Sequence, residues 1–258
     1  MKVLIHSKPE EAIAQVAEIL AAKLRAKSDA VLGLATGGTM EAVYQNLVSI
    51  HHEGRVSFRE ATSFNLDEYV GLKPDHPCSY WRYMREHLFD HVDFDHSRTH
   101  LPFGDAADPE AEAARYEASI VAAGDIDLQL LGLGANGHIG FNEPTSSLTS
   151  LTRIKTLTRS TREANARFFE TFDEVPRLAI TMGIGTIMRA DEVVLLAYGA
   201  GKAEAVAAMV EGPLSAVCPA SVLQMHRKAT VVLDEAAASK LALRDYYQEV
   251  HPDGRDAI

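Results

Sequence analysis

The sequence predicts an α/β fold in which a doubly wound, mostly parallel sheet carries helices on both faces, a three-layer, Rossmann-like arrangement. Strand-like apolar runs alternate with Ala- and Glu-rich helical segments along the chain, which is the pattern of βαβ units. The 258 residues, 47% of them hydrophobic, suit one large α/β domain and can build a sizeable core. No repeat, linker or low-complexity segment divides the sequence. We therefore expect a single domain over residues 1–258.

In the first half of the chain, strands and helices can be located from their apolar patterns and from residues that begin helices. Lys2–His6 has the pattern of a strand, and Pro9 in a first helical turn opens an Ala/Glu/Leu-rich helix to about Lys27. The elements expected next are, in order, a strand at Asp29–Ala35, a helix at Met40–His52, a strand at Thr62–Leu66, a helix at Ser79–Phe89 and a helix at Pro109–Ala123.

The second half continues the alternation from the apolar run Ile126–Leu133, which has the length and content of a buried strand. A hydroxyl-rich segment then leads into a strand that carries Arg153 and Lys155 on one face. The remaining elements expected are a helix at about Arg162–Phe169, strands at Pro176–Thr181 and Asp191–Tyr198, an Ala-rich helix after Lys202, a strand at Ala229–Leu233 and a helix at Asp234–Val250.

Charge and composition restrict the classes of partner. The formal net charge is −11 and no basic stretch offsets it, which argues against nucleic acids and anionic membranes but not against a small anionic substrate. No run approaches the roughly eighteen apolar residues of a membrane span. Met1–His6 is too short and too polar-flanked for the apolar region of a signal peptide. Cys78 and Cys218 lack C-x-x-C spacing, so we expect two thiols in a soluble, cytoplasmic protein.

The most informative stretch follows the strand at Ile126–Leu133. A glycine-rich turn there lets the backbone bend tightly and approach a ligand closely. Ligands of open α/β sheets bind just beyond the carboxyl ends of the strands, where this turn falls. Four side chains able to hold or move protons lie within eight positions of the turn: Asn136, His138, Asn142 and Glu143. A plain connection needs glycines but no His and Glu beside them, so we interpret the stretch as a catalytic loop.

A dinucleotide site is the alternative interpretation of the same glycines. Gly132–Gly137 matches G-x-G-x-x-G after a strand, the fingerprint of nicotinamide-binding folds. That motif must open a helix whose N-terminus receives the pyrophosphate. Gly140 and Pro144 interrupt any helix here, so we favour the catalytic loop and expect no organic cofactor.

Two further turns at strand ends carry candidate ligand groups. Thr36–Thr39 joins a strand to a helix through two glycines, which predicts a cradle of backbone amides for an anion, or else an ordinary turn with Thr39 as the helix N-cap. Lys202 ends a second glycine turn and is either a phosphate ligand or a solvated lysine. Asp67 and Glu68 follow the third strand, where they could cap a helix or act on a substrate. The histidines show no metal-ligand spacing, and we expect no metal site.

These motifs together resemble glucosamine-6-phosphate deaminases. The resemblance rests on Leu34–Thr39, Phe64–Gly71 and Gly134–Pro144, and it extends over about residues 2–250 through Thr152–Thr158 and Ala164–Phe169. Two positions depart from common members of that family. Asn136 stands where some members have Asp, and Met40 stands where members often have Pro.

The resemblance implies a reaction that turns an amino-sugar phosphate and water into fructose 6-phosphate and ammonia without a cofactor. It implies that Asp67 is the base of enolisation, that His138 moves the proton that opens the sugar ring, and that Glu143 and Asn136 orient this imidazole. The groups that it implies for the substrate phosphate are Gly37, Gly38, Thr39, Arg167 and Lys202.

Three rival functions stay open at this point. A 6-phosphogluconolactonase resembles the same fold and glycine turn, but it has no need for Asp67 together with the His138–Glu143 pair. A deaminase for galactosamine phosphate would use the same groups on the C4 epimer. A sugar-phosphate sensor would keep the anion cradle and discard the catalytic side chains.

The resemblance also leads to the hypothesis that N-acetylglucosamine 6-phosphate activates the protein. The positions that match the activator site of regulated members are Ser146, Arg153, Lys155, Thr156 and Tyr246. Arg153 and Lys155 alternate along one strand, so both cations can meet one phosphate; the alternative is a solvated charge pair. Because that site lies between subunits in regulated members, we expect a homo-oligomer, a hexamer if the chain is regulated.

Overall fold

The computed structural model describes residues 1–166 and 169–255 of the chain. Its main sheet has seven strands in the order β1-β10-β9-β6-β2-β3-β5, and every neighbouring pair is parallel. The strands are β1 Lys2–His6, β2 Val31–Leu34, β3 Thr62–Asn65, β5 Thr99–His100, β6 Leu128–Gly132, β9 Glu192–Ala197 and β10 Ala229–Asp234.

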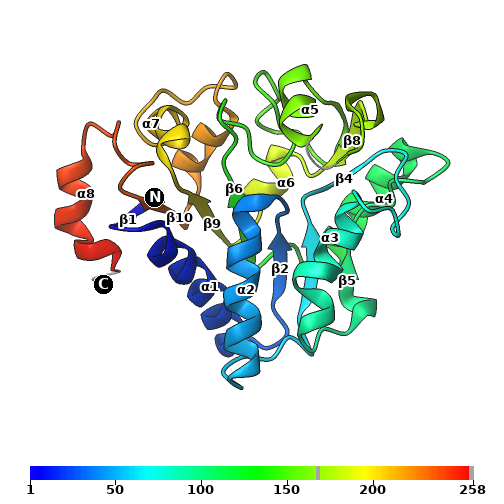
Figure 1. Cartoon of the computed structure of the whole chain (residues 1–258), viewed down its shortest axis with the longest axis horizontal. Helices are drawn as coiled ribbons and strands as arrows, with labels where there is room; N and C mark the ends of the chain where they lie inside the picture. The colour runs from blue at the N-terminus through cyan, green and yellow to red at the C-terminus, as the bar shows by residue number, and fades with distance from the viewer. Residues whose placement is uncertain (167–168, 256–258) are drawn as a thin grey trace.

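Helices on both faces of this sheet complete the three layers, as the sequence predicts. The α-helices of the described residues are α1 Pro9–Ala26, α2 Gly38–His52, α3 Tyr80–His87, α4 Pro109–Ala122, α5 Arg159–Asn165, α6 Ile184–Met188, α7 Ala203–Val210 and α8 Arg244–Val250. Figure 1 shows α1 and α2 side by side across the near face of the sheet. Among the helices of the described ranges, none has the length and apolar content needed to cross a membrane.

The strand order places a topological switch point between β2 and β6. From β2 the chain moves outward to β3 and β5, whereas from β6 it moves the other way to β9 and β10. The two strands pair only through Leu32 with Leu128 and Gly33 with Gln129, short of their carboxyl ends. Segments leaving the two strands therefore diverge and leave a crevice, the position at which open α/β sheets bind ligands.

A second, three-stranded antiparallel sheet lies beside these carboxyl ends, which the sequence does not predict. It consists of β4 Asp67–Tyr69, β8 Leu178–Thr181 and β7 Arg153–Thr156, in the order β4-β8-β7. The strand expected at Pro176–Thr181 thus pairs here rather than in the parallel sheet. Since the chain passes from β3 to β4 at Leu66, Asp67 lies at the carboxyl end of β3 and opposite Thr181.

Two predicted helices are corrected by the structure. The helix expected at Asp234–Val250 is wrong, because only Arg244–Val250 is α-helical and a run of turns precedes it. The Glu211 carboxylate accepts the backbone N–H groups of Ala242 and Leu243, and these tertiary bonds outweigh the helix propensity of the Ala-rich segment. The helix expected from about Arg162 begins earlier, at Arg159.

Candidate active site

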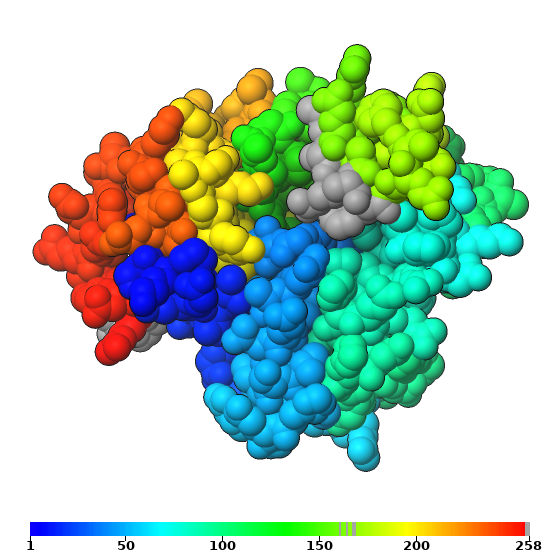
Figure 2. All heavy atoms as spheres, in the orientation of Figure 1, coloured from blue at the N-terminus to red at the C-terminus, as the bar shows by residue number. Residues whose placement is uncertain are grey.

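A cavity of about 530 Å³ opens at the switch point. Figure 2 shows this face hollowed above the start of α2, between the green loop that follows β6 and the yellow segment around α7. The residues proposed from the sequence that line the cavity are Gly37, Gly38, Thr39, Asp67, Asn136, His138 and Lys202. Glu143 lies behind its wall, and Arg167 falls outside the described residues.

The glycine turn after β2 forms one end of the cavity. Gly37 has φ of 103°, in the region that favours glycine, and is the N-cap of α2, so Thr39 is not the N-cap. The first N–H groups of a helix have no intrahelical acceptor, and here they face the cavity with the positive end of the α2 dipole. The hydroxyl of Tyr83 donates to the Gly37 carbonyl oxygen at 2.9 Å and holds the turn from outside. This end of the cavity is therefore suited to bind an anion.

Lys202 contributes a cation at the border of the cavity. Its Nζ donates to the carbonyl oxygen of Leu133 at 2.7 Å, which places the ammonium beside the loop that follows β6. Burial lowers the pKa of Lys202 from its ordinary value. Burial disfavours the charged ammonium, and a bound anion would stabilise that charge, so the site is suited to a phosphate.

Asp67 supplies a buried carboxylate in the middle of the cavity wall. Its side chain is 5% exposed, and its Oδ2 accepts a long hydrogen bond of 3.4 Å from the Thr181 hydroxyl. Burial raises the pKa of Asp67 to about 7, although hydrogen bonds from Thr181 and the Phe141 backbone oppose the shift. A carboxylate of this basicity can take a proton from carbon near neutral pH.

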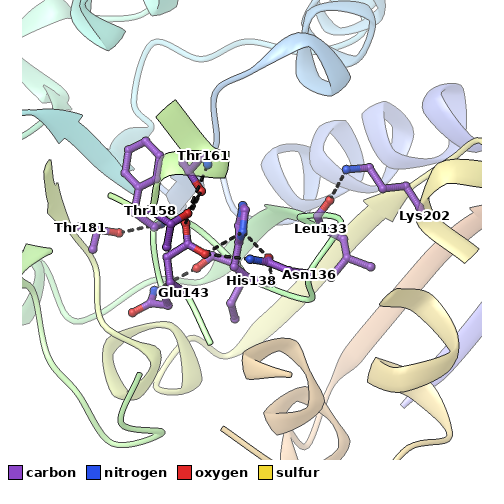
Figure 3. A network of polar contacts seen from close by, with 11 residues as sticks. Leu133, Asn136, His138, Glu143, Thr158, Thr161, Thr181 and Lys202 are labelled. Carbon is purple, nitrogen blue, oxygen red and sulfur yellow. Dashed lines mark hydrogen bonds and ion pairs between the residues drawn. The ribbon is translucent and has the colours of Figure 1, made fainter. Parts of the chain in front are cut away.

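His138, Asn136 and Glu143 form a hydrogen-bonded network on the loop after β6 (Figure 3). Nδ1 of His138 lies 2.6 Å from Oδ1 of Asn136 and 3.6 Å from Oε2 of Glu143, while Nδ2 of Asn136 donates to that Oε2 at 2.9 Å. Two oxygen acceptors face Nδ1, so this nitrogen carries the proton and Nε2 keeps a lone pair when the ring is neutral. A Cβ at Gly134 would lie 2.3 Å from the imidazole, so a larger residue there would displace the ring from this position.

Glu143 is the charged anchor of the network. Burial acts to raise its pKa, but hydrogen bonds from His138, Thr161 and Asn136 outweigh burial and lower the pKa to about 2. Its Oε1 accepts from the Thr158 hydroxyl at 3.2 Å and also from the Thr161 hydroxyl. The Glu143 carboxylate near Nδ1 can balance the charge that the ring gains when Nε2 accepts a proton from a substrate.

The comparisons with known proteins agree with one another. The family model described as "Glucosamine-6-phosphate isomerases/6-phosphogluconolactonase" matches residues 7–232. A protein of Shewanella woodyi named "Glucosamine-6-phosphate deaminase" is 53% identical over 258 residues, which cover 100% of this chain and 98% of that protein. The chain belongs to the glucosamine-6-phosphate deaminase family.

Other members of the deaminase family support the same placement. The deaminase of Hahella chejuensis is 55% identical over 253 residues, covering 98% of this chain and 97% of its own length. A solved structure described as a monomeric glucosamine-6-phosphate deaminase has a TM-score of 0.91 at 48% identity, over 93% of this chain and 100% of that one. The 6-phosphogluconolactonase of Trypanosoma brucei, with a TM-score of 0.74 at 20% identity, covers 93% of this chain and 98% of its own and shares the fold alone.

In this deaminase-family chain the glycine loop does not open a helix. Residues 133–145 are turns and an isolated bridge between Ile139 and Asn142. The dinucleotide fingerprint at Gly132–Gly137 therefore lacks the helix that it requires. Within the part of the chain that the structure describes, no three His, Cys, Asp or Glu side chains gather as a metal-binding group.

Sequence reasoning missed four residues of the site. Thr158 is the N-cap of α5, and its side chain accepts a hydrogen bond from the backbone N–H of Thr161. A Thr directly before a helical segment is a cap signal that can be seen in the sequence. Tyr80 lines the cavity with its ring stacked on Phe141, at 6.2 Å between centroids, whereas the sequence indicates only that it belongs to a helix. The missed residues are Tyr80, Thr158, Thr161 and Thr181.

The proposed activator positions lie in two places. Arg153 and Lys155 are half-buried on β7, and Ser146 is buried with no hydrogen-bond partner for its hydroxyl among the described residues. Thr156 is exposed at the end of the same strand. Tyr246 lies on α8, which packs against β1, and Figure 1 shows α8 and β8, the partner of β7, at opposite sides of the molecule. One chain therefore does not bring Tyr246 to Arg153.

Proposed function

We propose that this chain converts glucosamine 6-phosphate and water into fructose 6-phosphate and ammonia. The observation that carries the proposal is one cavity that combines an anion cradle, the buried Asp67 and the His138–Asn136–Glu143 network. The named deaminases that match the whole chain at about half of its positions support the same reaction.

The substrate phosphate would bind at the N-terminus of α2. Backbone amides of Gly38 and Thr39 would donate to its oxygens, and Lys202 would supply a cation. Arg167 is a proposed further ligand from outside the described residues. This anchor is remote from the carbons that react, so its binding energy orients the sugar along the cavity toward Asp67 and His138.

The His138–Asn136–Glu143 network would catalyse opening of the sugar ring. Opening the pyranose breaks the C1–O5 bond, moves a proton from the O1 hydroxyl to O5, and leaves an aldehyde at C1. Nε2 of His138 can accept the first proton and return it, since Asn136 and Glu143 hold Nδ1 and balance the imidazolium. Glu143 stays ionised throughout, because its pKa is held at about 2.

Asp67 would then act on the open chain. The carboxylate takes the proton from C2, the electron pair of that bond forms a C1–C2 double bond, the C1=O pair moves to O1, which takes up a proton from solvent, and an enolamine results. Return of a proton to C1 moves the double bond to C2 and nitrogen, and water adds to that imine and expels ammonia. A single carboxyl can serve both proton steps, since its pKa of about 7 lets it accept and donate near neutral pH.

An assay with two substrates tests the assignment. We expect ammonia and fructose 6-phosphate in equal amounts from glucosamine 6-phosphate, and no comparable hydrolysis of 6-phosphogluconolactone. Galactosamine 6-phosphate in the same assay measures the preference at C4. Absence of ammonia together with fast lactone hydrolysis would establish the lactonase alternative.

The pKa of Asp67 predicts how the rate depends on pH. Only the ionised carboxylate can take the C2 proton, so kcat/KM falls as pH falls through about 7, the pKa of Asp67 in the free protein. Glu143, with its pKa of about 2, does not titrate in this window, whereas the neighbouring Glu68, whose pKa burial raises to about 8, does. The same profile recorded with Glu68→Gln isolates the contribution of Asp67. Initial rates of ammonia release between about pH 5 and pH 9 measure the profile. A flat profile through this range would remove Asp67 from the rate-limiting proton transfer.

Regulation by N-acetylglucosamine 6-phosphate stays a prediction. If Arg153 and Lys155 bind its phosphate, the activator lowers the substrate concentration for half-saturation, and the protein is an oligomer in solution. The solved relative at 48% identity is described as monomeric, which makes mass the informative companion measurement. A hyperbolic curve that the activator does not shift, from a monomer, would leave the two cations as surface charge.

We also propose one catalytic domain that works in the cytoplasm. The cavity draws on segments from Ala35 to Lys202, which favours a single functional unit. Cys78 and Cys218 form no disulfide, as is usual in a reducing compartment. Fractionation of the native host with an antibody to the chain tests the location.

A further inference from the structure

Glu68 is a fully buried carboxylate next to the base in sequence. Successive side chains of a strand point to opposite faces, so Asp67 faces the cavity while Glu68 faces away from it toward α3. The Glu68 side chain is 0% exposed, and the site of Gly104 closes over it, since a Cβ there would lie 3.2 Å from Cγ of Glu68. The position of this carboxylate is therefore fixed by packing as well as by hydrogen bonds.

Both carboxylate oxygens of Glu68 accept hydrogen bonds from backbone N–H groups. Its Oε1 accepts from Tyr69 at 2.8 Å, and its Oε2 accepts from Tyr80 at 2.9 Å and Trp81 at 3.1 Å. Tyr80 and Trp81 are the first two residues of α3, whose N–H groups have no intrahelical acceptor. Glu68 thus ties the N-terminus of α3 to β4, and the helix dipole favours a negative charge there.

The helix held in this way acts on the cavity at two points, once in its wall and once behind the anion cradle. Tyr80 and Tyr83 are three positions apart and share a face of α3. The Tyr80 ring lines the cavity beside Asp67, and the Tyr83 hydroxyl donates to Gly37 in the anion cradle. One carboxylate therefore fixes β4, which carries the base, relative to the helix that holds the cradle.

We infer that Glu68 is a positioning residue that sets the distance between the enolisation base and the phosphate cradle through α3. The inference rests on the proposed deaminase function. It assigns no contact with substrate to Glu68. Its consequence is that loss of the Glu68 bonds disturbs substrate binding at the cradle and proton transfer at Asp67 together.

The test replaces Glu68 by Gln, whose amide nitrogen cannot accept a hydrogen bond. Whichever way the amide turns, it faces an N–H group of Tyr69 or those of α3 with a donor. Burial raises the pKa of Glu68 to about 8, so rates are compared at about pH 9, where the native carboxyl is ionised. We expect Glu68→Gln to lower kcat/KM by about tenfold or more, with KM raised and kcat reduced.

A matched control separates position from stability. Asp108 caps α4 through its Oδ1, which accepts the N–H groups of Glu110 and Ala111 away from the cavity. Asp108→Ala should lower Tm while kcat/KM stays within about twofold. The chain has one tryptophan, Trp81, so its emission reports on the N-terminus of α3. A shift to longer wavelength is expected in Glu68→Gln and not in Asp108→Ala.

A double-mutant cycle with Tyr83→Phe decides the route of the effect. If Glu68 acts through α3, Tyr83→Phe raises KM by about fivefold in the native background and by little in the Glu68→Gln background. Additive increases in KM would overturn the inference, as would unchanged kcat/KM in Glu68→Gln. Absence of ammonia release from the unmodified protein would instead refute the proposed function.

A milder variant keeps the test decisive if Glu68→Gln does not fold. Ser79→Ala removes only the N-cap hydroxyl of α3, which accepts from the Arg82 N–H at 3.1 Å. We expect KM to rise by about twofold to fivefold relative to Asp108→Ala. An unchanged KM in Ser79→Ala would show that the position of α3 does not control the cradle.

Discussion

Asp67→Asn should lower kcat by about a thousandfold or more while KM for glucosamine 6-phosphate changes little. The amide cannot accept the C2 proton, whereas the phosphate binds at the other end of the cavity in the ground state and the transition state alike. Substrate labelled with deuterium at C2 should keep its label with the variant. A raised KM with nearly normal kcat would instead assign Asp67 to the phosphate end.

The same variant should be more stable than the native protein above neutral pH. The pKa of Asp67 in the fold is about 7 against an ordinary 3.8, so its contribution to stability is present below about pH 4 and is lost as pH rises through 7. At pH 8 the buried charge costs roughly 4 kcal/mol of folding free energy, which Asn removes. Tm of Asp67→Asn should exceed that of the native chain at pH 8, and the difference should vanish near pH 4. Equal Tm values at both pH values would contradict a buried base.

His138→Gln should lower turnover of the cyclic substrate by about a hundredfold to ten-thousandfold. Glutamine can hold a hydrogen bond to Asn136 but cannot carry a proton from O1 to O5. The loss should be much smaller for an analogue that lacks O5 and cannot close the six-membered ring, because the work of His138 ends once the ring is open.

The comparison of the two substrates contains its own control. Both carry the same phosphate and the same C2–H, so both report equally on the cradle and on Asp67. Equal losses on the two substrates would place His138 in enolisation or amine loss instead of ring opening.

The sequence places the loop after β6 at the cavity because the signals of this loop are local. Glycines that a tight approach requires, as at Gly134 beneath the imidazole, stand beside the titratable groups that they serve. Strand–turn–helix order also places Gly37 and Lys202 at strand carboxyl ends, which one edge of a parallel sheet brings together.

The remaining features depend on contacts between distant segments. The strand Asp67–Tyr69 is too short and too polar to show a period, and it forms because β8 pairs with it. The structure separates the two carboxylates: Asp67 faces the cavity, and Glu68 caps a helix twelve residues further along. No local pattern distinguishes them until α3 is in place.

The most direct test of this account is a crystal structure with 2-amino-2-deoxyglucitol 6-phosphate, an open-chain analogue of the substrate. We expect the phosphate on the amides of Gly38 and Thr39, the O5 hydroxyl at His138, and C2 within about 3.5 Å of an Asp67 carboxylate oxygen. The reverse orientation, with the phosphate beside Asp67 or with C2 turned away from it, would contradict the assignment of Asp67 as the base.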